Sequence, residues 1–538
     1  MKKKLALLLA AVMTVSLLSA CSGNNSGSSA APTQPATQAP AGQGTQAPTQ
    51  PATQAPAPAV EYKDQVIIGV QTKTTTTNPT AQTSVAHGIM FNLTHNSLVS
   101  YDESTGKISP ELATEWTHSD DLKTWNFTLR NDVTFHNGEK FKADDVVFTV
   151  EYGKEAEAAT VKSLYGGITA TATDDTHVTF ELKNPNLDLL YTLAGASFGI
   201  LNRKAVTDSA ENGPAIGTGA YVNKEFVPGD HTLLERNDNF WGEKPQTKSL
   251  LFRYMAEASA RLIALENGEI DVCQAPNNTE LDLIKSNSKL GLTTYQATAL
   301  TFLGFNTQDS VLADQNLRLA IAHALNVQEI IDGAASGFAG IADGMWGYFQ
   351  YGYFNDWASV GQAAYSYNMD KAKEYMAKSA YKDGVTIKFM TSTTWRVNAL
   401  QIVQSQLKAL NINVEIDEVD AAGLSAKAKE GDYQVIMYSV TFTAAGSDAA
   451  KVYRPGMTAN YAKYDNAKVT ELFDKANAET DDTKRKELYK EIQVIVHEEC
   501  PYMPLYYANS GAAYIATLEG AVFNSSGTFD YTYVRVPK

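Results

Sequence analysis

The stretch VTIKFM, Val385–Met390, begins the part of the sequence that decides the fold. Its β-branched and aromatic residues predict a strand. Downstream, apolar residues first recur at helical spacing and then alternate with polar residues, which predicts a helix followed by a half-buried strand. The helical set is Leu400, Val403, Leu407 and Leu410, and the alternating set is Ile412, Val414 and Ile416. A strand, helix and strand in this order form a βαβ unit, which implies parallel sheet.

A second helix is predicted over Asp482–Glu499, where apolar residues form one face and Cys500-Pro501 ends the helix. Together with the βαβ unit, this helix indicates an α/β chain with a wide sheet. The chain has 538 residues, enough for three or more folding units. Its net charge of -16 makes binding to a nucleic-acid backbone unfavourable, so we expect no nucleic-acid partner.

The N-terminus is typical of an export signal. Lys2, Lys3 and Lys4 precede an apolar stretch from Leu5 to Leu18 that is too short for an ordinary membrane span. The following Leu18-Ser19-Ala20-Cys21 resembles the lipobox of bacterial lipoproteins, in which the cysteine is lipidated and becomes the new N-terminus. We therefore expect residues 1–20 to be removed and Cys21 to carry a lipid anchor. An ordinary signal peptide with a nearby cysteine is the alternative.

A linker follows the lipobox. Residues 22–60 carry no charge and are rich in Pro, Thr, Gln and Ala, and the ten letters APTQPATQAP occur at both 31–40 and 47–56. Such low-complexity sequence does not build a core, so we interpret residues 21–63 as a lipidated, disordered tether. A glycosylated stalk is the alternative. From about Asp64 to Lys538 the composition is globular.

Motifs for enzyme chemistry are scarce. The sequence has no Walker A loop, HExxH, CxxC or GxGxxG. One GxSxG occurs at Gly195–Gly199, and as a nucleophile elbow it would need a strand before Ser197 and a helix after it. The histidines lack metal-ligand spacing, so no metal site and no cofactor are expected. Cys273 and Cys500 could form a disulfide in an exported protein, although nothing in the sequence brings them together.

A series of motifs along the globular part closely resembles the solute-binding proteins of peptide and nickel ABC importers, known as extracellular solute-binding protein family 5. The densest part lies within residues 112–148. The motifs are Leu112–Trp116, Trp125–Arg130, Val133–Gly138, Ala143–Phe148, Gly217–Tyr221, Phe240–Gly242, Gly268–Val272, Leu317–Leu325, Tyr367–Ala372 and Pro501–Tyr506. Trp116, Phe127, Val146, Val147 and Phe148 are interpreted as core residues of this signature.

The resemblance implies an α/β fold of the periplasmic-binding-protein type II, a two-lobed Venus-flytrap clamp with an extra inserted domain. Lobe I would comprise residues 64–100, 218–302 and 506–538, the inserted domain 101–217, and lobe III 303–505. Such clamps close around a ligand, and the closed form is recognised by membrane subunits.

The resemblance also suggests ligand-binding residues. Thr83, Ser84 and Val85 fall where peptide binders hydrogen-bond the ligand backbone, and a solvated loop is the alternative. Trp395 and Arg396 fall where some dipeptide binders set an arginine against the ligand carboxylate, as a bidentate pair would allow. A surface salt bridge of Arg396 is the alternative.

The sequence departs from the peptide-binding pattern near residue 440. Tyr438 and Ser439 replace the usual Gly-Trp, and Thr441 or Phe442 stands where an aspartate would pair with the ligand ammonium. Asp448 is the nearest carboxylate downstream. Because a buried ammonium without a carboxylate is costly, the departure disfavours a free-amino peptide. It leaves a neutral solute, such as an oligosaccharide, or a capped or modified peptide as alternatives. Nearby aromatics, from Trp346 to Trp357, could then stack on sugar rings, or belong to the core.

The resemblance as a whole predicts a monomeric, exported lipoprotein that binds a peptide and delivers it to ABC permease subunits without chemical change. A surface hydrolase built on Ser197 is the alternative from another class. A sensor on the same scaffold, which would bind the ligand without importing it, is a third interpretation.

Overall fold

The predicted βαβ unit is present in the computed structural model, which describes residues 60–81, 85–457 and 459–538. Strand β14 (Val385–Thr391) leads through helix α11 (Thr394–Leu407) to strand β15 (Ile412–Glu418), and the two strands pair in parallel. The turn before β15 places Asn411 at φ +56°, a left-handed conformation that asparagine tolerates. Leu400, Val403 and Leu407 are buried, as the helical spacing predicted.

The α/β prediction is confirmed by a mixed eleven-stranded sheet in the described residues. Ten strands lie in the order β15, β14, β16, β12, β17, β11, β1, β10, β9 and β8, and β13 also pairs with β17. The remaining bounds are β16 (Val435–Thr441), β12 (Leu290–Phe305), β17 (Tyr502–Ile515), β11 (Val272–Gln274), β1 (Gln65–Val70), β10 (Ser249–Tyr254), β9 (His231–Arg236), β8 (Tyr221–Val227) and β13 (Ala339–Ile341).

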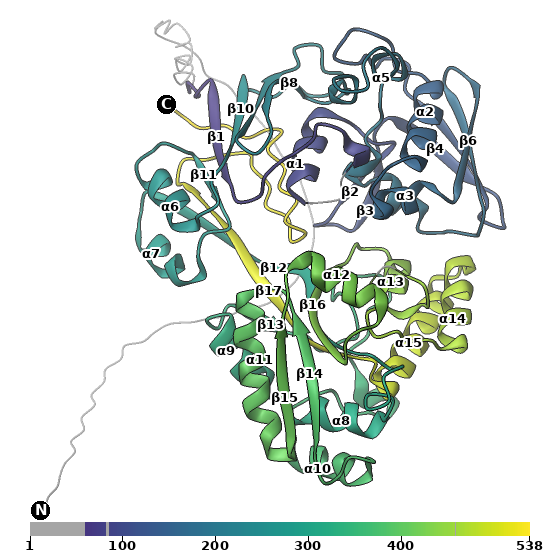
Figure 1. Ribbon diagram of the computed structural model, residues 1–538. Helices are drawn as coiled ribbons and strands as arrows, with labels where there is room; N and C mark the ends of the chain where they lie inside the picture. Colours follow the sequence, from purple (N-terminus) through teal and green to yellow (C-terminus); the bar gives the residue numbers. More distant parts are fainter. Residues whose placement is uncertain (1–59, 82–84, 458) are drawn as a thin grey trace, which may run out of the picture. The chain divides into compact units, whose positions relative to one another are not determined.

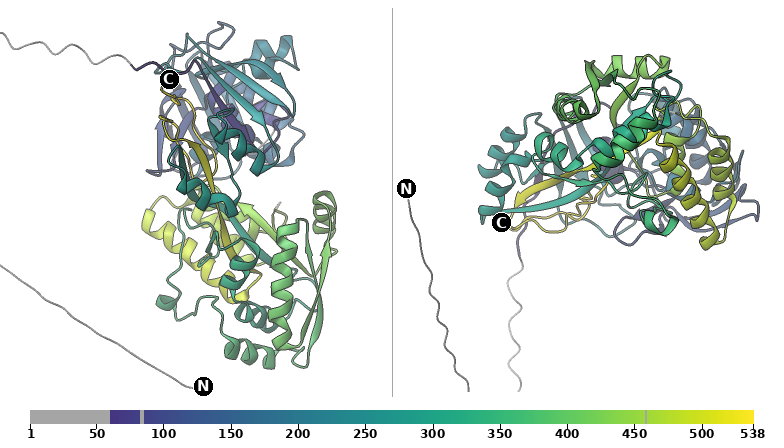
Figure 2. Two further views of the ribbon diagram at one scale, coloured as in Figure 1. Left: turned by 90° about the vertical axis from the view of Figure 1, so that its left-hand side faces the viewer. Right: turned by 90° about the horizontal axis from the view of Figure 1, so that it is seen from below.

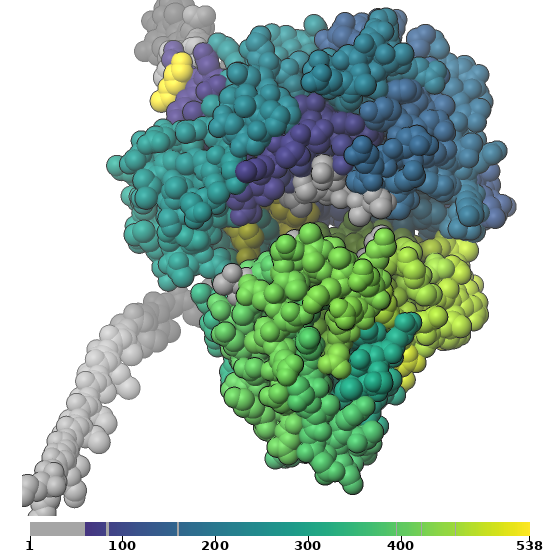
Figure 3. Space-filling view, viewed as in Figure 1, coloured from purple at the N-terminus to yellow at the C-terminus, as the bar shows by residue number. Residues whose placement is uncertain are grey.

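Two long antiparallel strands, β12 and β17, connect the two ends of this sheet (Figures 1 and 2). Residues Leu290–Gln296 of β12 pair with the end of β17 that adjoins β11. The register then shifts between Gln296 and Leu300, and residues 299–305 pair with β16. On the face shown in Figure 3, the surface is hollowed between the purple residues near α1 (Val85–Thr94) and the green residues near α12 (Ala421–Glu430).

A separate four-stranded antiparallel sheet follows the order β4, β5, β7 and β6, and a two-stranded sheet joins β2 and β3. Their bounds are β4 (Ala113–His118), β5 (Thr124–Leu129), β7 (His177–Leu182), β6 (Ile168–Asp174), β2 (Val99–Asp102) and β3 (Lys107–Pro110). Of the signature residues expected in the core, Phe127 and Val146 are buried, and Trp116 and Val147 are partly buried against the same core. Phe148 is partly buried too. The lobe boundaries themselves remain a prediction.

Helices cover these sheets (Figure 1). The predicted helix Asp482–Glu499 is α15, whose N-cap Asp481 accepts a hydrogen bond from the Lys484 amide, and which ends at Cys500 in a left-handed conformation. The other α-helices are α2 (Ala143–Lys154), α3 (Ala159–Tyr165), α4 (Leu189–Leu193), α5 (Arg203–Asp208), α6 (Ala258–Glu266), α7 (Leu281–Ser286), α8 (Gln315–Ala324), α9 (Val327–Ala334), α10 (Met369–Lys378), α13 (Ala450–Tyr453) and α14 (Ala467–Ala478). No described helix is both long and apolar enough to cross a membrane.

Candidate functional site

One face of the sheet changes from apolar to polar near the carboxyl ends of β14 and β16. On β16 the buried Met437 is followed, on the same face, by Ser439, and on the paired β12 the buried Leu303 is preceded by Thr301. β14 and β16 run parallel, so their carboxyl ends lie at the same edge. This edge, followed by a helix N-terminus, is where α/β sheets commonly bind ligands.

Arg396, in the first turn of α11, reaches this polar edge. Its Nη2 donates to Ser439 Oγ at 3.0 Å, and Ser439 Oγ lies 2.9 Å from Thr301 Oγ1. The Nε of Arg396 is buried and has no hydrogen-bond partner among the described residues. Burial lowers the pKa of Arg396, an effect that Tyr506 opposes. Arg396 is thus a largely desolvated cation whose Nε–H has no acceptor among the described residues.

Aromatic groups surround this cation. Tyr506 on β17 pairs with Thr301 across the sheet, and burial raises the pKa of its hydroxyl, an effect that Arg396 and Thr301 oppose. The Trp395 ring lies 4.7 Å from the Arg396 guanidinium and 6.3 Å from the Tyr506 ring, and Trp395 is 37% exposed. Ile341, opposite Tyr506 on β13, is 50% exposed. We define Thr301, Trp395, Arg396, Ser439 and Tyr506 as the Arg396 site.

This arrangement suits an anionic group beside an apolar one. A guanidinium with free donors binds a carboxylate through paired, charge-assisted hydrogen bonds. One of the Ser439 and Thr301 hydroxyls is the donor in the hydrogen bond between them, so the other can donate to the same anion. Trp395 and Ile341 offer exposed apolar surface next to it. The site can therefore hold the carboxylate end of a small solute, with a side chain against the aromatic rim.

Two of the predicted ligand residues lie on the opposite face of β16. Tyr438 is 4% exposed, its ring stacks on Phe302, and its hydroxyl donates to the Ala459 carbonyl. Phe442 is 2% exposed and also packs against Phe302. Because side chains alternate along a strand, residues 438 and 442 share a face that 439 and 441 do not. We therefore leave Tyr438 and Phe442 out of the candidate site.

Two further predicted residues lie at the end of β16. Thr441 is exposed, and its carbonyl accepts a hydrogen bond from Lys451 Nζ. Asp448 forms an ion pair with Lys451 at 2.7 Å and accepts a hydrogen bond from the Thr443 amide at 2.8 Å. The Asp448 carboxylate is thus already paired within the chain.

Three predicted residues lie outside what the structure describes. Thr83, Ser84 and the lipobox Cys21 fall in undescribed segments, and Val85 is described only as the first residue of α1. Of the neighbouring aromatics, Trp346 and Trp357 are buried in the core. The sugar-stacking interpretation therefore does not fit these two tryptophans.

The remaining predictions from motifs concern Ser197 and the cysteines. Ser197 lies in the 3₁₀ helix η2 (Ala196–Phe198), which follows helix α4 directly, so the strand that a nucleophile elbow requires before the serine is missing from these described residues. Cys273 and Cys500 are both free and buried, and they belong to different core clusters. Among the described residues no group of acidic, histidine or cysteine side chains could hold a metal ion.

Thr301, Tyr506 and Lys451 were missed by sequence reasoning. Thr301 and Tyr506 reach the site only through strand register, because β12 and β17 are about 200 positions apart in the chain. A signal for Lys451 was available, since it stands three residues after Asp448 and pairs at that spacing are common near helix starts.

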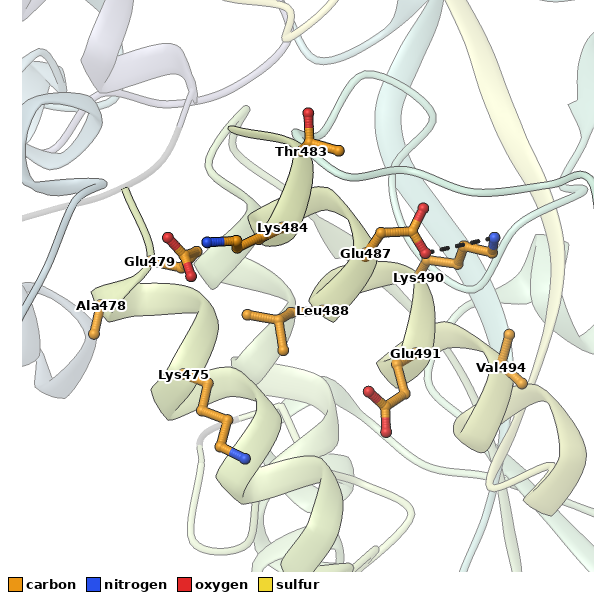
Figure 4. Close-up of a pocket in the computed structure, with 10 residues that line it drawn as sticks. All are labelled: Lys475, Ala478, Glu479, Thr483, Lys484, Glu487, Leu488, Lys490, Glu491 and Val494. Atoms are coloured by element: carbon orange, nitrogen blue, oxygen red, sulfur yellow. Dashed lines mark ion pairs between the residues drawn. The ribbon is translucent and has the colours of Figure 1, made fainter. Parts of the chain in front are cut away.

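A surface hollow also lies between α14 and α15 (Figure 4). Leu488 is labelled at its centre, and charged side chains surround it, among them Lys475, Glu479 and Glu487. Glu487 forms an ion pair with Lys490 at 3.6 Å. These charges balance one another on an open surface, so this hollow is a weaker candidate than the Arg396 site.

Comparison with known proteins identifies the family of the chain. The family model for bacterial extracellular solute-binding proteins, family 5 Middle, matches residues 107–450. The chain belongs to this family. A relative in the family is a probable D,D-dipeptide-binding periplasmic protein of Escherichia coli, 27% identical over 497 residues, covering 87% of this chain and 93% of the relative. Another is a dipeptide-binding protein of the same organism, 26% identical and covering 82% of this chain and 89% of the relative.

Solved structures show the same fold for this family 5 protein. A substrate-binding protein of an ABC transporter from Listeria monocytogenes has a TM-score of 0.79 at 22% identity, covering 89% of this chain and 100% of its own. A periplasmic binding protein from Helicobacter pylori, in complex with the peptide STSA, has a TM-score of 0.75 at 22% identity, covering 88% and 98%. The predicted family and the periplasmic-binding-protein fold are thereby confirmed.

Proposed function

We propose that this family 5 protein is the substrate-binding component of an ABC importer, which captures a peptide outside the cell and delivers it to the membrane subunits. Relatives in the family are named as dipeptide-binding proteins. The observation on this chain that supports a peptide is Arg396, a partly desolvated cation whose Nε is free and whose Nη2 donates to the linked hydroxyls of Ser439 and Thr301. A peptide carboxylate would supply the missing anion.

In this proposal the Arg396 site lies on a closing clamp. The carboxylate would bind Arg396, Ser439 and Thr301, and a side chain would lie on Trp395. Contacts that the bound solute gains from the opposite lobe would favour the closed form, because a ligand shifts a conformational equilibrium only through contacts that differ between the two states. The membrane subunits would then recognise the closed form, and no bond of the ligand would be broken.

Native mass spectrometry tests this function. The protein is purified without residues 1–20, measured intact, then denatured so that any retained solute can be identified. A bound peptide, or a set of peptides, is the expected result. A bound neutral sugar would contradict the peptide proposal, because such a ligand has no carboxylate to form an ion pair with Arg396. If no solute is retained, fluorescence titration with a peptide digest decides, and absence of binding overturns the proposal.

We also propose that the mature chain is anchored through a lipid on Cys21, with the segment 21–63 as a tether. The arrangement Lys2–Lys4, apolar stretch and Leu18–Cys21 supports this proposal. Cys21→Ala should release the protein from membranes into the soluble fraction, which fractionation and immunoblotting would detect. Retention of the variant on membranes would contradict the lipid anchor without touching the binding function.

A further inference from the structure

The ammonium of Lys451 lies in surroundings that would recognise any alkyl ammonium. Its Nζ donates to the Thr441 carbonyl at 2.7 Å and to Asp448 Oδ2 at 2.7 Å. It also lies 5.0 Å from the centre of the Phe442 ring. A carboxylate, a carbonyl and an aromatic face together satisfy the hydrogen bonds and charge of a primary ammonium.

These surroundings are held in place by the chain. Asp448 lies in the 3₁₀ helix η7 (Gly446–Ala449), and the Thr443 amide donates to its carboxylate at 2.8 Å. Phe442 is buried against Phe302. The Lys451 and Asp448 side chains are only 22% and 21% exposed, so this pair is less hydrated than a typical surface pair.

The position of this pair relative to the Arg396 site follows from β16. Lys451 contacts β16 at the main-chain carbonyl of Thr441, which lies two residues beyond Ser439, about 6.6 Å along the strand at the usual rise per residue. An extended dipeptide spans about the same length between its amino nitrogen and its carboxylate, since it too has two residues. A peptide whose carboxylate met Arg396 and Ser439 could therefore extend its amino end toward Thr441.

From these contacts we propose that Lys451 is a specificity-determining residue, whose ammonium fills the place where a ligand ammonium would otherwise bind. The proposal rests on the proposed function. A free-amino peptide would place its ammonium beside that of Lys451, and the two like charges would repel. Asp448 is already paired with Lys451, so it would not be free to compensate the added charge. The site therefore selects carboxylate ligands whose amino end is uncharged, such as N-acylated peptides.

A paired-ligand binding experiment tests this inference. The probes are dipeptides to pentapeptides, each in a free-amino form and an N-acetylated form, mixed in equal amounts and measured by native mass spectrometry against the whole mature chain. We expect wild type to prefer the acetylated partner by about tenfold or more. Lys451→Met should reverse or abolish this preference by freeing Asp448, and adding Asp448→Asn to that variant should remove the gain for free-amino peptides.

The matched control is Lys378→Met, which breaks a Lys–Glu pair with the same 2.7 Å separation on the exposed surface of α10. It should leave the preference of wild type unchanged. Equal binding of both forms by wild type, or a preference for the free amine, overturns the role of Lys451 even if the variants fail to fold. If wild type binds no peptide of either form, the proposed peptide function itself fails, and the inference fails with it.

Discussion

Arg318, which is buried, and Arg396, which is partly buried, both lie on helices of the C-terminal half of the chain, yet their surroundings differ. Arg318 on α8 donates through Nε, Nη1 and Nη2 to main-chain carbonyls, so every nitrogen of its guanidinium is used. The acceptors are Leu312, Ala313, Glu499 and Cys500. Within the part of the chain that the structure describes, the side chain of Arg396 has one hydrogen bond, to Ser439, and a buried Nε without a partner. The satisfied donors of Arg318 fit a structural role, whereas the free Nε of Arg396 fits the proposed ligand-binding role.

The difference has an energetic basis. Desolvating a charged group costs several kcal/mol unless hydrogen bonds replace the lost water. Arg318 recovers that cost from the C-terminal carbonyls of α15, which themselves need donors. Arg396 recovers only part of it, so in our proposal a bound anion would relieve the residual cost. Sites for ligands commonly contain such uncompensated groups.

Arg318→Met should produce the largest effect. The substitution removes the Arg318 donors from four carbonyls, of which those of Leu312 and Cys500 belong to buried residues, and it removes the link between α8 and the end of α15. We therefore expect the free energy of unfolding to fall by about 3–5 kcal/mol. Urea denaturation followed by far-UV circular dichroism measures this change, with the exposed Lys378→Met as a control. A loss below about 1 kcal/mol would show that water molecules replace Arg318 as donors to these carbonyls. Arg318 would then be no more important for stability than Arg396.

Arg485 supplies an intermediate case, because its partner is a carboxylate. Its Nη2 lies 2.7 Å from Asp188 Oδ1, and the two side chains are only 6% and 3% exposed. Asp188 precedes α4 and also accepts a hydrogen bond from the Ser447 amide, so the pair joins segments far apart in sequence. Asp188→Asn should lower the free energy of unfolding by about 3 kcal/mol, because it leaves Arg485 as an unpaired buried charge.

A double-mutant cycle checks this interpretation. Arg485→Met removes the charge as well, so the combined variant should be less destabilised than the sum of the single variants. Additive losses in the free energy of unfolding, measured by denaturation, would mean that Asp188 and Arg485 contribute independently and that their ion pair has no coupling energy.

Arg396→Met should reverse the pattern of Arg318→Met. Stability should stay within about 1 kcal/mol of wild type, because few native hydrogen bonds are lost. Ligand affinity should fall about 100-fold, equivalent to ~2.7 kcal/mol, because the ligand carboxylate loses its charged partner. Isothermal titration calorimetry with the solute identified by mass spectrometry measures the effect. Retained affinity, or unfolding comparable to that of Arg318→Met, would make Arg396 a structural residue.

The fold could be predicted where periodicity is strong. The VTIKFM strand, the helix after it and the next strand were predicted because apolar spacing reports burial directly. The helix Asp482–Glu499 was predicted to its last residue because Pro501 cannot continue it. The register shift near Gln296 was not predictable, since it depends on how β12 is shared between β17 and β16.

The site was harder to predict than the fold. Arg396 and Ser439 came from the resemblance, but the resemblance could not tell which face of β16 each residue occupies. Alternation along the strand puts Ser439 beside Arg396 and Tyr438 in the core. Nor could it show that Asp448 is paired with Lys451, because a side-chain ion pair depends on the turn that precedes α13.

Glu111 extends the comparison to a group that can lose its charge, which Arg396 cannot do near neutral pH. Burial is the main cause that raises the pKa of Glu111 to about 7, although hydrogen bonds from Asn96 and the Ser97 amide oppose the shift. A carboxyl with a raised pKa in the folded state stabilises the protein below its ordinary pKa of 4.5, and this contribution is lost as pH rises through about 7.

Glu111→Gln cannot ionise, so its free energy of unfolding relative to wild type should increase between pH 5 and 8, by on the order of 1 kcal/mol. The buried His95 and the partly buried His136, whose pKa values desolvation lowers to about 3 and about 4, destabilise the fold as pH falls. Both proteins contain these histidines, so the difference between the two stability curves removes their effect. Urea denaturation at several pH values measures that difference. A pH-independent difference would mean that Glu111 stays charged in the folded protein because its two hydrogen-bond donors satisfy the carboxylate. Burial alone would then not distinguish Arg396 from the arginines whose hydrogen bonds are satisfied.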